Sequence, residues 1–221
     1  MTVVDRKLAI NISVLIAYFA KLITSHSQTV PNVVLLYETL CPGCRMTMSQ
    51  ELPKALTKFG SDIFVSLVPY GFADMKIGPN GSVNFYCHHG PDECIGNAWH
   101  ACSHFYMSPK ERLEYVICTM TGYRMQLPRA LKKCTSPGMA AQLEKCAKGP
   151  QGIALVKLMA DISQMAGAIV SPNDSVVPWV PYFFIDGRPD NDSHNTKSLT
   201  ELICEKATNK PQQCLDTKTR R

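Results

Sequence analysis

The sequence lacks several features that would place it in other classes of protein. It has no internal repeats and no low-complexity tracts, and without a Gly-x-Ser-x-Gly motif a serine hydrolase has no support. Charged residues make up only 19% of the chain, and apart from residues 218–221 the basic ones are scattered, so no nucleic-acid partner is expected. With 45% apolar residues among 221, the chain should instead bury a sizeable core as one globular domain.

Hydrophobic runs long enough to cross a bilayer are also missing. Near the N-terminus a basic pair precedes an apolar run at residues 8–20, and Ser25 and Ser27 form a small-x-small site. This pattern is typical of a secretory signal peptide, here residues 1–27, with an uncleaved anchor as the alternative because Lys21 lies close to the run. After signal cleavage no membrane association is expected, and the last four residues are not an ER-retention signal, so we expect export past the ER.

A pair of cysteines follows the first predicted strand. Residues 33–37 are a short apolar run typical of a buried strand, and Cys41-Pro42-Gly43-Cys44 leads from it into a helical pattern. A strand that brings a C-x-x-C pair to the first turn of a helix is the thioredoxin arrangement. The helix N-terminus favours a thiolate, so Cys41, the more exposed thiol, is expected to attack a disulfide and Cys44 to resolve the mixed disulfide. A structural disulfide and half of a zinc site remain alternatives.

The other cysteines indicate an oxidising compartment. Eight of them allow four structural disulfides in 105 possible pairings, which the sequence does not distinguish; they are Cys87, Cys94, Cys102, Cys118, Cys134, Cys146, Cys204 and Cys214. The segment from Cys87 through His88 and His89 to Cys94 contains zinc-ligand types, but an oxidised chain tends to pair such cysteines and no second C-x-x-C completes a set of four. No metal site is predicted.

Three Asn-x-Ser sequons follow the signal, at Asn80, Asn173 and Asn191. Each lies among turn residues, where a glycan can be accommodated. An exported chain with these triplets is expected to be glycosylated.

The order of predicted elements indicates the fold. A second strand at residues 62–70, closed by Gly71, completes a βαβ unit with the first strand and the dithiol helix, which Pro53 should kink. A strand at 182–185 and a helix at 199–207 close the chain.

An insertion separates these two parts. Residues 72–177 hold six of the ten cysteines and are expected to form helical pieces, with helix starts at Ser108 and Ser136 and an amphipathic helix from Gly152 to Ala168. We therefore predict an α/β, thioredoxin-like domain at residues 28–221, with a disulfide-rich and mainly helical insertion between the first βαβ unit and the C-terminal strand and helix.

The dipeptide Val180-Pro181 leads directly into the last predicted strand. Thioredoxin-like folds place a cis-proline at this entrance, facing the dithiol, where the backbone of the preceding residue can pair with a bound peptide. We therefore predict a cis bond before Pro181, with Pro178 as the rival position, and a substrate-binding role for Val180 and Pro181.

The segment Cys87–Cys102 resembles the signature of the gamma-interferon-inducible lysosomal thiol reductase (GILT) family. That signature reads Cys-Gln-His-Gly, two variable residues, Glu-Cys, two variable residues, Asn, four variable residues, Cys. Every fixed position matches, except that His88 stands in place of Gln. The resemblance extends to the Cys41–Cys44 motif, to Leu67–Gly71 and to Val180-Pro181, and it covers nearly all of the mature chain.

The resemblance implies a thioredoxin-like enzyme that reduces disulfides of other proteins at acid pH, glycosylated and delivered to lysosomes or secreted. Carried over to this chain, it makes Cys41 the nucleophile, Cys44 the resolving thiol and Pro181 the substrate-side cis-proline. It also implies that the signature cysteines form structural bridges, and Cys118, Cys146, Cys204 and Cys214 fall where such proteins carry cysteines.

These observations together predict a thiol–disulfide oxidoreductase with protein substrates, no tightly bound cofactor and a small thiol as electron donor. A disulfide oxidase or isomerase, and a secreted disulfide-rich interaction protein with an inert Cys41–Cys44 bond, are the alternatives. At about pH 5 an ordinary thiol of pKa about 8.5 is almost wholly protonated, so we expect a strongly depressed pKa for Cys41. Backbone N–H groups, helped by Arg45, are the expected source of that shift.

Overall fold

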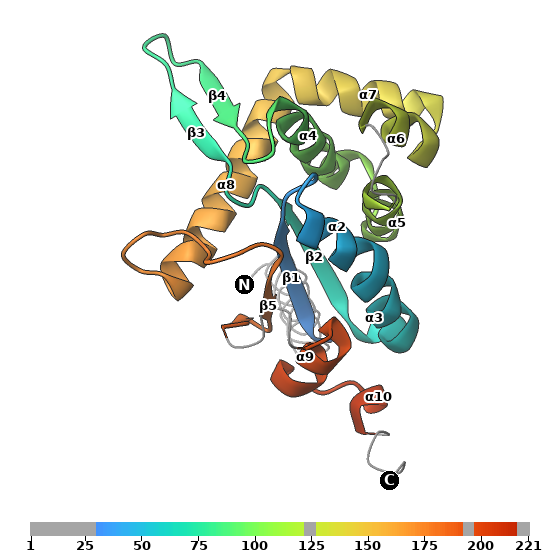
Figure 1. Ribbon diagram of the computed structural model, residues 1–221. Helices are drawn as coiled ribbons and strands as arrows, with labels where there is room; N and C mark the ends of the chain where they lie inside the picture. The colour runs from blue at the N-terminus through green and yellow to red at the C-terminus, as the bar shows by residue number, and fades with distance from the viewer. Residues whose placement is uncertain (1–29, 122–126, 192–196, 216–221) are drawn as a thin grey trace, which may run out of the picture. The chain divides into compact units, whose positions relative to one another are not determined.

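The computed structural model describes residues 30–121, 127–191 and 197–215 (Figure 1). The predicted signal peptide, its alternative as an anchor and the basic C-terminal residues lie outside this part of the chain. All that follows concerns the compact unit Pro31–Arg221.

A four-stranded sheet in the order β2-β1-β5-β6 forms the centre of this unit. Strand β1 (Asn32–Tyr37) pairs in parallel with β2 (Phe64–Pro69) and antiparallel with β5 (Tyr182–Ile185), which also pairs with β6 (Arg188–Pro189). The three strands predicted from apolar runs are confirmed, and β6, only two residues long, was not predicted.

Strand β1 lies inside the sheet, and its successive side chains enter cores on opposite faces. Leu35 packs in a cluster with Met48 of the dithiol helix, whereas Leu36 packs with Met159 and Tyr182 on the other face. Both leucines are fully buried. This two-sided burial explains why the strand reads as a continuous apolar run.

The connection from β1 to β2 is helical throughout and carries the dithiol. It consists of α2 (Pro42–Met46), a π-helical turn (Thr47–Glu51), α3 (Leu52–Phe59) and a short 3₁₀ turn (Gly60–Asp62). Pro53 lies in the first turn of α3 and has no N–H to donate to the carbonyl four residues back. A π-helical turn at Thr47–Glu51 directly precedes this position, while the kink expected at Pro53 stays a prediction. The parallel β1–β2 pair confirms the βαβ unit.

The insertion lies between β2 and β5 and is mainly helical (Figure 1). Helices α5 and α7 begin after the N-caps Ser108 and Ser136, as predicted. The elements of the insertion are β3 (Asp74–Ile77), β4 (Val83–Tyr86), α4 (Pro91–Tyr106), α5 (Pro109–Met120), α6 (Leu127–Cys134), α7 (Pro137–Lys148) and α8 (Pro150–Val170).

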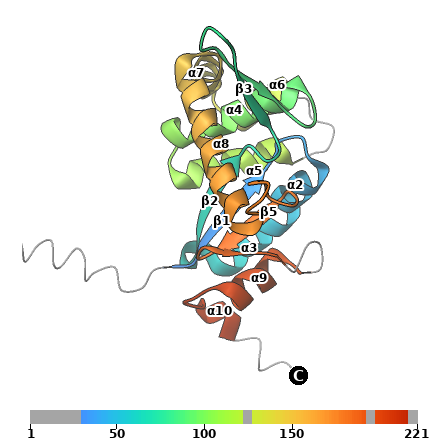
Figure 2. The same cartoon turned by 90° about the vertical axis from the view of Figure 1, so that its left-hand side faces the viewer.

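Two short helices, α9 (Leu199–Lys206) and α10 (Gln212–Leu215), end the described chain. They lie at the opposite end of the unit from the β3–β4 hairpin, as both ribbon views show (Figure 2). The closing helix predicted at residues 199–207 is thus confirmed to within one residue.

Four disulfides tie these elements together, the number that the sequence allowed. They join Cys87 to Cys94, Cys102 to Cys146, Cys118 to Cys134 and Cys204 to Cys214. The first three lie within the insertion and the fourth links α9 to α10. Since Cys87 and Cys94 are bonded to each other, neither is available as a zinc ligand.

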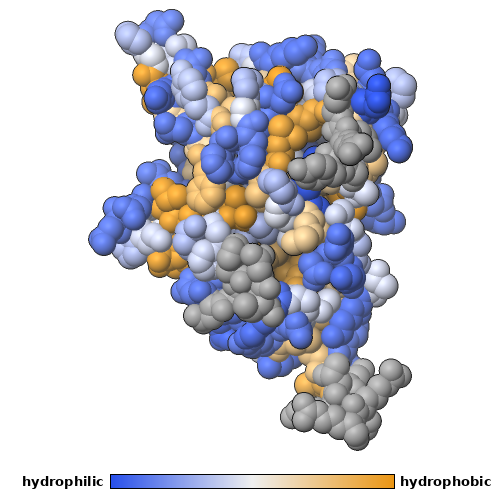
Figure 3. All heavy atoms as spheres, viewed as in Figure 1, coloured by the Kyte–Doolittle hydropathy of each residue, from blue (hydrophilic) through white to orange (hydrophobic). Residues whose placement is uncertain are grey.

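Helix α8 covers the sheet face opposite to α2 and α3, through Val156 and Met159 among others. Among the described residues it is the one helix long and apolar enough to cross a bilayer on length and composition, so the expectation that no later stretch has this property was too strong. A third of its apolar window is buried inside the unit. Apolar side chains of its C-terminal half and of the following loop reach the surface in the left centre of Figure 3; Met165 is 69% exposed and Ile169 62%.

Candidate active site

The two thiols lie at the N-terminal end of α2, shortly after the end of β1. Cys41 is the N-cap of α2, and Pro42 occupies the first helical turn, where its missing N–H costs nothing. Cys44 is fully buried and Cys41 is 8% exposed, and neither forms a disulfide. The expectation that Cys41 is the more exposed thiol is confirmed.

The environment pushes the pKa values of the two thiols apart. The Cys44 thiol donates a hydrogen bond that lowers the pKa of Cys41 to about 6, and the N–H groups of Cys44 and Gly43 and the charge of His89 add to this effect against the opposing burial. Burial, followed by that same hydrogen bond and the charge of Cys41, raises the pKa of Cys44 well above its ordinary value. The N–H of Glu38 also donates to Cys44 Sγ at 3.4 Å. Such a pair provides a nucleophile and a held proton.

The predicted contribution of backbone N–H groups to the low Cys41 pKa is confirmed, but Arg45, the side chain expected to help, is not among its main causes. Arg45 is buried and its Nη1 donates to the Thr39 carbonyl at 3.3 Å, so it helps to hold the loop before Cys41. The Cys44 thiol and His89 are the side chains that lower the Cys41 pKa. His89 was missed because it lies 48 positions from Cys41 and is brought near it by the fold.

The Val180–Pro181 peptide bond is cis and lies beside the dithiol, as predicted. The Cys41 thiol donates to the Val180 carbonyl, with Sγ and the oxygen 3.8 Å apart. A Cβ at Gly43 would lie 3.4 Å from Pro181 Cδ, so the absence of a side chain at Gly43 lets α2 approach the proline closely. Val180 and Pro181 therefore occupy the place predicted for substrate contact.

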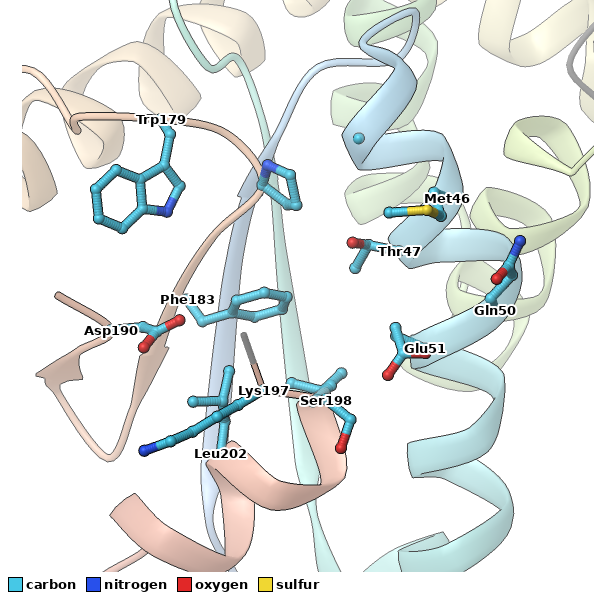
Figure 4. A pocket seen from close by; sticks show the side chains of 13 residues that line it. Met46, Thr47, Gln50, Glu51, Trp179, Phe183, Asp190, Lys197, Ser198 and Leu202 are labelled. Atoms are coloured by element: carbon cyan, nitrogen blue, oxygen red, sulfur yellow. The ribbon is translucent and has the colours of Figure 1, made fainter. Parts of the chain in front are cut away.

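A groove of about 510 Å³ opens next to Gly43 and Pro181. Figure 4 shows Met46 and Thr47 of the dithiol helix on one side and Trp179 and Phe183 on the other, with α9 below. The groove combines apolar surface with polar groups, and Met46 is half exposed within it. Sequence reasoning missed this groove because its walls come from three separate segments.

The signature segment holds the loop that ends in Cys41. The side-chain oxygen of Asn97 accepts the N–H of Thr39 at 3.1 Å, and Glu93 Oε2 accepts the N–H of Leu40 at 3.1 Å. Gly96 leaves room for the same loop, since a Cβ there would lie 2.5 Å from Thr39 Oγ1. Two fixed positions of the motif, Glu93 and Asn97, and the variable position Gly96 thus hold the loop that leads to Cys41.

A buried carboxylate, Glu38, is the first residue of this loop and was not singled out in the sequence. Its side chain is fully buried, and its Oε1 accepts the N–H of Phe72 at 2.7 Å. Burial raises its pKa to about 7. Gly71 has a φ of +60° and a Cβ there would lie 2.3 Å from Glu38 Cγ, so the residue that closes β2 has to be glycine.

The predicted glycan sites lie at the surface. Asn80, Asn173 and Asn191 are all exposed. The side-chain oxygen of Asn191 accepts a hydrogen bond from the Tyr182 hydroxyl, while the rest of that sequon lies outside the described residues. Glycosylation stays a prediction.

Comparison with known proteins shows similarity to one family. The model of the gamma interferon inducible lysosomal thiol reductase (GILT) family matches residues 32–137. The chain is 30% identical over 179 residues to the gamma-interferon-inducible lysosomal thiol reductase of Carassius auratus, covering 78% of this chain and 67% of that protein. It is 27% identical over 187 residues to the protein of the same name from Mus musculus, covering 83% and 71%.

Solved structures show similarity in fold at low sequence identity. BdbD from Bacillus subtilis matches with a TM-score of 0.53 and 14% identity, covering 79% of this chain and 86% of that chain. DsbA from Chlamydia trachomatis matches with a TM-score of 0.50 and 12% identity, covering 78% and 82%. With the sheet described above, these matches confirm the thioredoxin-like fold with a helical insertion.

Proposed function

The chain belongs to the gamma-interferon-inducible lysosomal thiol reductase family, and we propose that it is a thiol–disulfide oxidoreductase that reduces disulfide bonds of protein substrates. The observation that carries this proposal is the split between the two thiols. Cys41, with a pKa of about 6, stands at the start of α2 beside Pro181, while buried Cys44 keeps its proton.

In the first step the Cys41 thiolate attacks one sulfur of the substrate disulfide. A bond forms between Cys41 Sγ and that sulfur, and the other substrate sulfur leaves as a thiolate that takes up a proton. The substrate lies along the groove, with its backbone next to the Val180 carbonyl and apolar side chains against Met46 and Trp179. The disulfide is thus presented to Cys41 by contacts on both sides.

In the second step Cys44 attacks Cys41 Sγ, which forms the Cys41–Cys44 disulfide and releases the second substrate thiol. Two of the causes that raise the Cys44 pKa are its hydrogen bond to Cys41 and the charge of Cys41. Both vanish once Cys41 is in the mixed disulfide, so Cys44 loses its proton more readily at the stage where it is needed. The N–H of Glu38 stays in place to stabilise the new thiolate.

Each cycle transfers two electrons from the dithiol to the substrate. The resulting Cys41–Cys44 disulfide is reduced again by two equivalents of a small thiol, and no tightly bound cofactor takes part. The eight other cysteines are held in disulfides and do not enter this exchange.

The thiol pKa supports a function in acidic compartments. With a pKa of about 6, roughly a tenth of Cys41 is thiolate at pH 5, against about 3 in 10⁴ for a thiol of pKa about 8.5. The lower pKa reduces intrinsic nucleophilicity about 13-fold for a Brønsted slope of about 0.45, which leaves a gain of roughly 20-fold at pH 5 but only about twofold at pH 7. Together with the names of the relatives and the leader pattern, this supports a lysosome-like compartment or secretion.

Trapping of the mixed disulfide tests the proposed chemistry. Reduced Cys44→Ser protein, incubated with a disulfide-bonded protein, should form a covalent adduct that is visible on a non-reducing gel, and mass spectrometry should locate the bond at Cys41. Cys41→Ser protein should form no adduct. An adduct of equal yield from Cys41→Ser, or none from either variant, would overturn the proposal.

A further inference from the structure

We infer that Glu38, His88 and His89 form a binding site for a divalent transition-metal cation, best matched by zinc, next to the dithiol loop. One atom from each residue lies within 4.8 Å of the others. This ligand set is different from the Cys87–Cys94 pair, whose sulfurs are bonded to each other.

The spacing of the ligand atoms fits tetrahedral zinc. Glu38 Oε2 lies 3.3 Å from His89 Nδ1 and 3.8 Å from His88 Nδ1. Zinc binds imidazole nitrogen and carboxylate oxygen at about 2.0–2.2 Å, which places neighbouring tetrahedral ligands about 3.4 Å apart. The pair with His89 is already at this separation. His88 lies 3.8 Å from Glu38 Oε2, and since the three ligand atoms are only within 4.8 Å of one another, its side chain has to turn inward to complete the set.

The buried carboxylate supplies an independent reason for a cation. Glu38 Oε1 is paired with the Phe72 N–H, but Oε2 is buried and makes no hydrogen bond with any residue that the structure describes. A buried carboxylate oxygen without a hydrogen bond is costly, and the groups in ion-pair contact with this one are two imidazoles, the commonest metal ligands in proteins. A cation between them would satisfy the oxygen.

Metal binding at His89 Nδ1 has to replace the hydrogen bond between this nitrogen and Glu93. His89 Nδ1 also lies 2.8 Å from Glu93 Oε2, to which it donates when it carries a proton. A metal on this nitrogen replaces that proton, yet Glu93 is not left unpaired. Its Oε2 keeps the N–H of Leu40 and its Oε1 keeps the N–H of His89. The exchange therefore leaves the loop before Cys41 fastened.

Access to the site is through His88. Its side chain is 62% exposed and stands edge-on to Phe72, with ring centroids 5.9 Å apart. It can turn toward the ion without disturbing the core, and water can take the fourth position. Three protein ligands and one open position are an established pattern for zinc.

His88 is also the one fixed position at which this chain departs from the family signature, which has Gln there. An amide side chain is not among the usual zinc ligands. His88→Gln thus removes one ligand while it restores the residue of the signature, and its exposure makes it harmless to folding.

The test is an isothermal titration calorimetry experiment at pH 7, in which zinc chloride is added to the mature protein carrying Cys41→Ser and Cys44→Ser. A competing chelator brings tight binding into the measurable range. The two serines remove the thiols, which would bind zinc themselves, and they also make the result independent of reductase activity. We expect one zinc per chain, and at least tenfold weaker binding when either His88→Gln or Glu38→Gln is added. Glu114→Gln, which changes an exposed carboxylate on α5, should bind zinc as tightly as the parent.

Zinc-edge X-ray absorption of the loaded protein should show nitrogen and oxygen neighbours and no sulfur. Because Glu38→Gln lies in the interior, its thermal unfolding is measured beside the titration, and the exposed His88→Gln carries the decision if the first variant does not fold. Absence of stoichiometric binding, or equal affinity with and without His88→Gln, would overturn the inference.

Discussion

Replacement of Cys44 by alanine should make Cys41 slower at acid pH and faster at alkaline pH. The hydrogen bond from the Cys44 thiol is the largest cause of the low Cys41 pKa of about 6. A hydrogen bond to a charged group contributes about 1.5–3 kcal/mol, and one pKa unit corresponds to about 1.4 kcal/mol. Loss of this bond should therefore raise the Cys41 pKa by about one to two units, to between about 7 and 8.

The change in rate follows from the thiolate fraction and the nucleophilicity. At pH 5 the fraction of thiolate falls about 10- to 90-fold, while nucleophilicity rises about three- to eightfold, so the reaction of Cys41 slows about three- to twelvefold. At pH 9 both forms are largely ionised, and the more basic thiolate should react about three- to sevenfold faster than in the wild type. The two pH profiles are expected to cross.

Alkylation by iodoacetamide, followed by mass spectrometry of the Cys41 peptide between pH 4 and pH 10, measures both effects. Cys44→Ser is the matched control, because its hydroxyl can still donate to Cys41 and should leave the midpoint nearer to 6. A Cys44→Ala midpoint that stays at the wild-type value would refute the assignment of the Cys44 thiol as the main stabiliser of the thiolate.

Three further changes test parts of the site. Gly71→Ala should lower the unfolding free energy by several kcal/mol in chemical denaturation, because its Cβ would clash with the Glu38 side chain. Gly81 has open space around it, so Gly81→Ala should show only the backbone cost of about 1–2 kcal/mol. Equal losses in the two variants would contradict the close approach of Gly71 to Glu38. Burial raises the pKa of Glu38 to about 7, so folding favours its protonated form and the stability of the protein should fall as the pH rises from about 4.5 through 7. In thermal melts over this pH range, Glu38→Gln should show a smaller fall. An equal fall in Glu38→Gln would contradict the role of Glu38. Trp179→Ala should raise KM for a disulfide-bonded protein severalfold in steady-state assays and leave the alkylation rate of Cys41 unchanged. An unchanged KM would show that Trp179 does not contact the substrate.

Local patterns were enough to predict the position of the dithiol. The apolar run of β1, the C-x-x-C spacing and the helical pattern after it are all contiguous, and each reflects a short-range rule of burial or helix formation. Pro181 could be placed because it stands directly before an apolar strand. The cis bond at this position agrees with the prediction.

Features that depend on contacts distant in sequence were not predicted. Glu38 looks like an ordinary loop residue until Phe72 and His89, 34 and 51 positions away, are brought against it. The pairing of eight cysteines is likewise decided by how the helices pack. Strand β3 was missed because it is mostly exposed and is held by its pairing with β4, so its sequence carries no apolar run.

The most direct test of the central claim is the rate at which pre-reduced protein reduces a disulfide-bonded protein in a single turnover at pH 5 and at pH 7. A Cys41 pKa of about 6 predicts a rate at pH 5 about tenfold below that at pH 7, whereas a thiol of pKa about 8.5 would lose about a hundredfold. Cys41→Ser should abolish the reaction at both pH values. A hundredfold fall, or activity that survives in Cys41→Ser, would contradict an acid-competent reductase with Cys41 as its nucleophile.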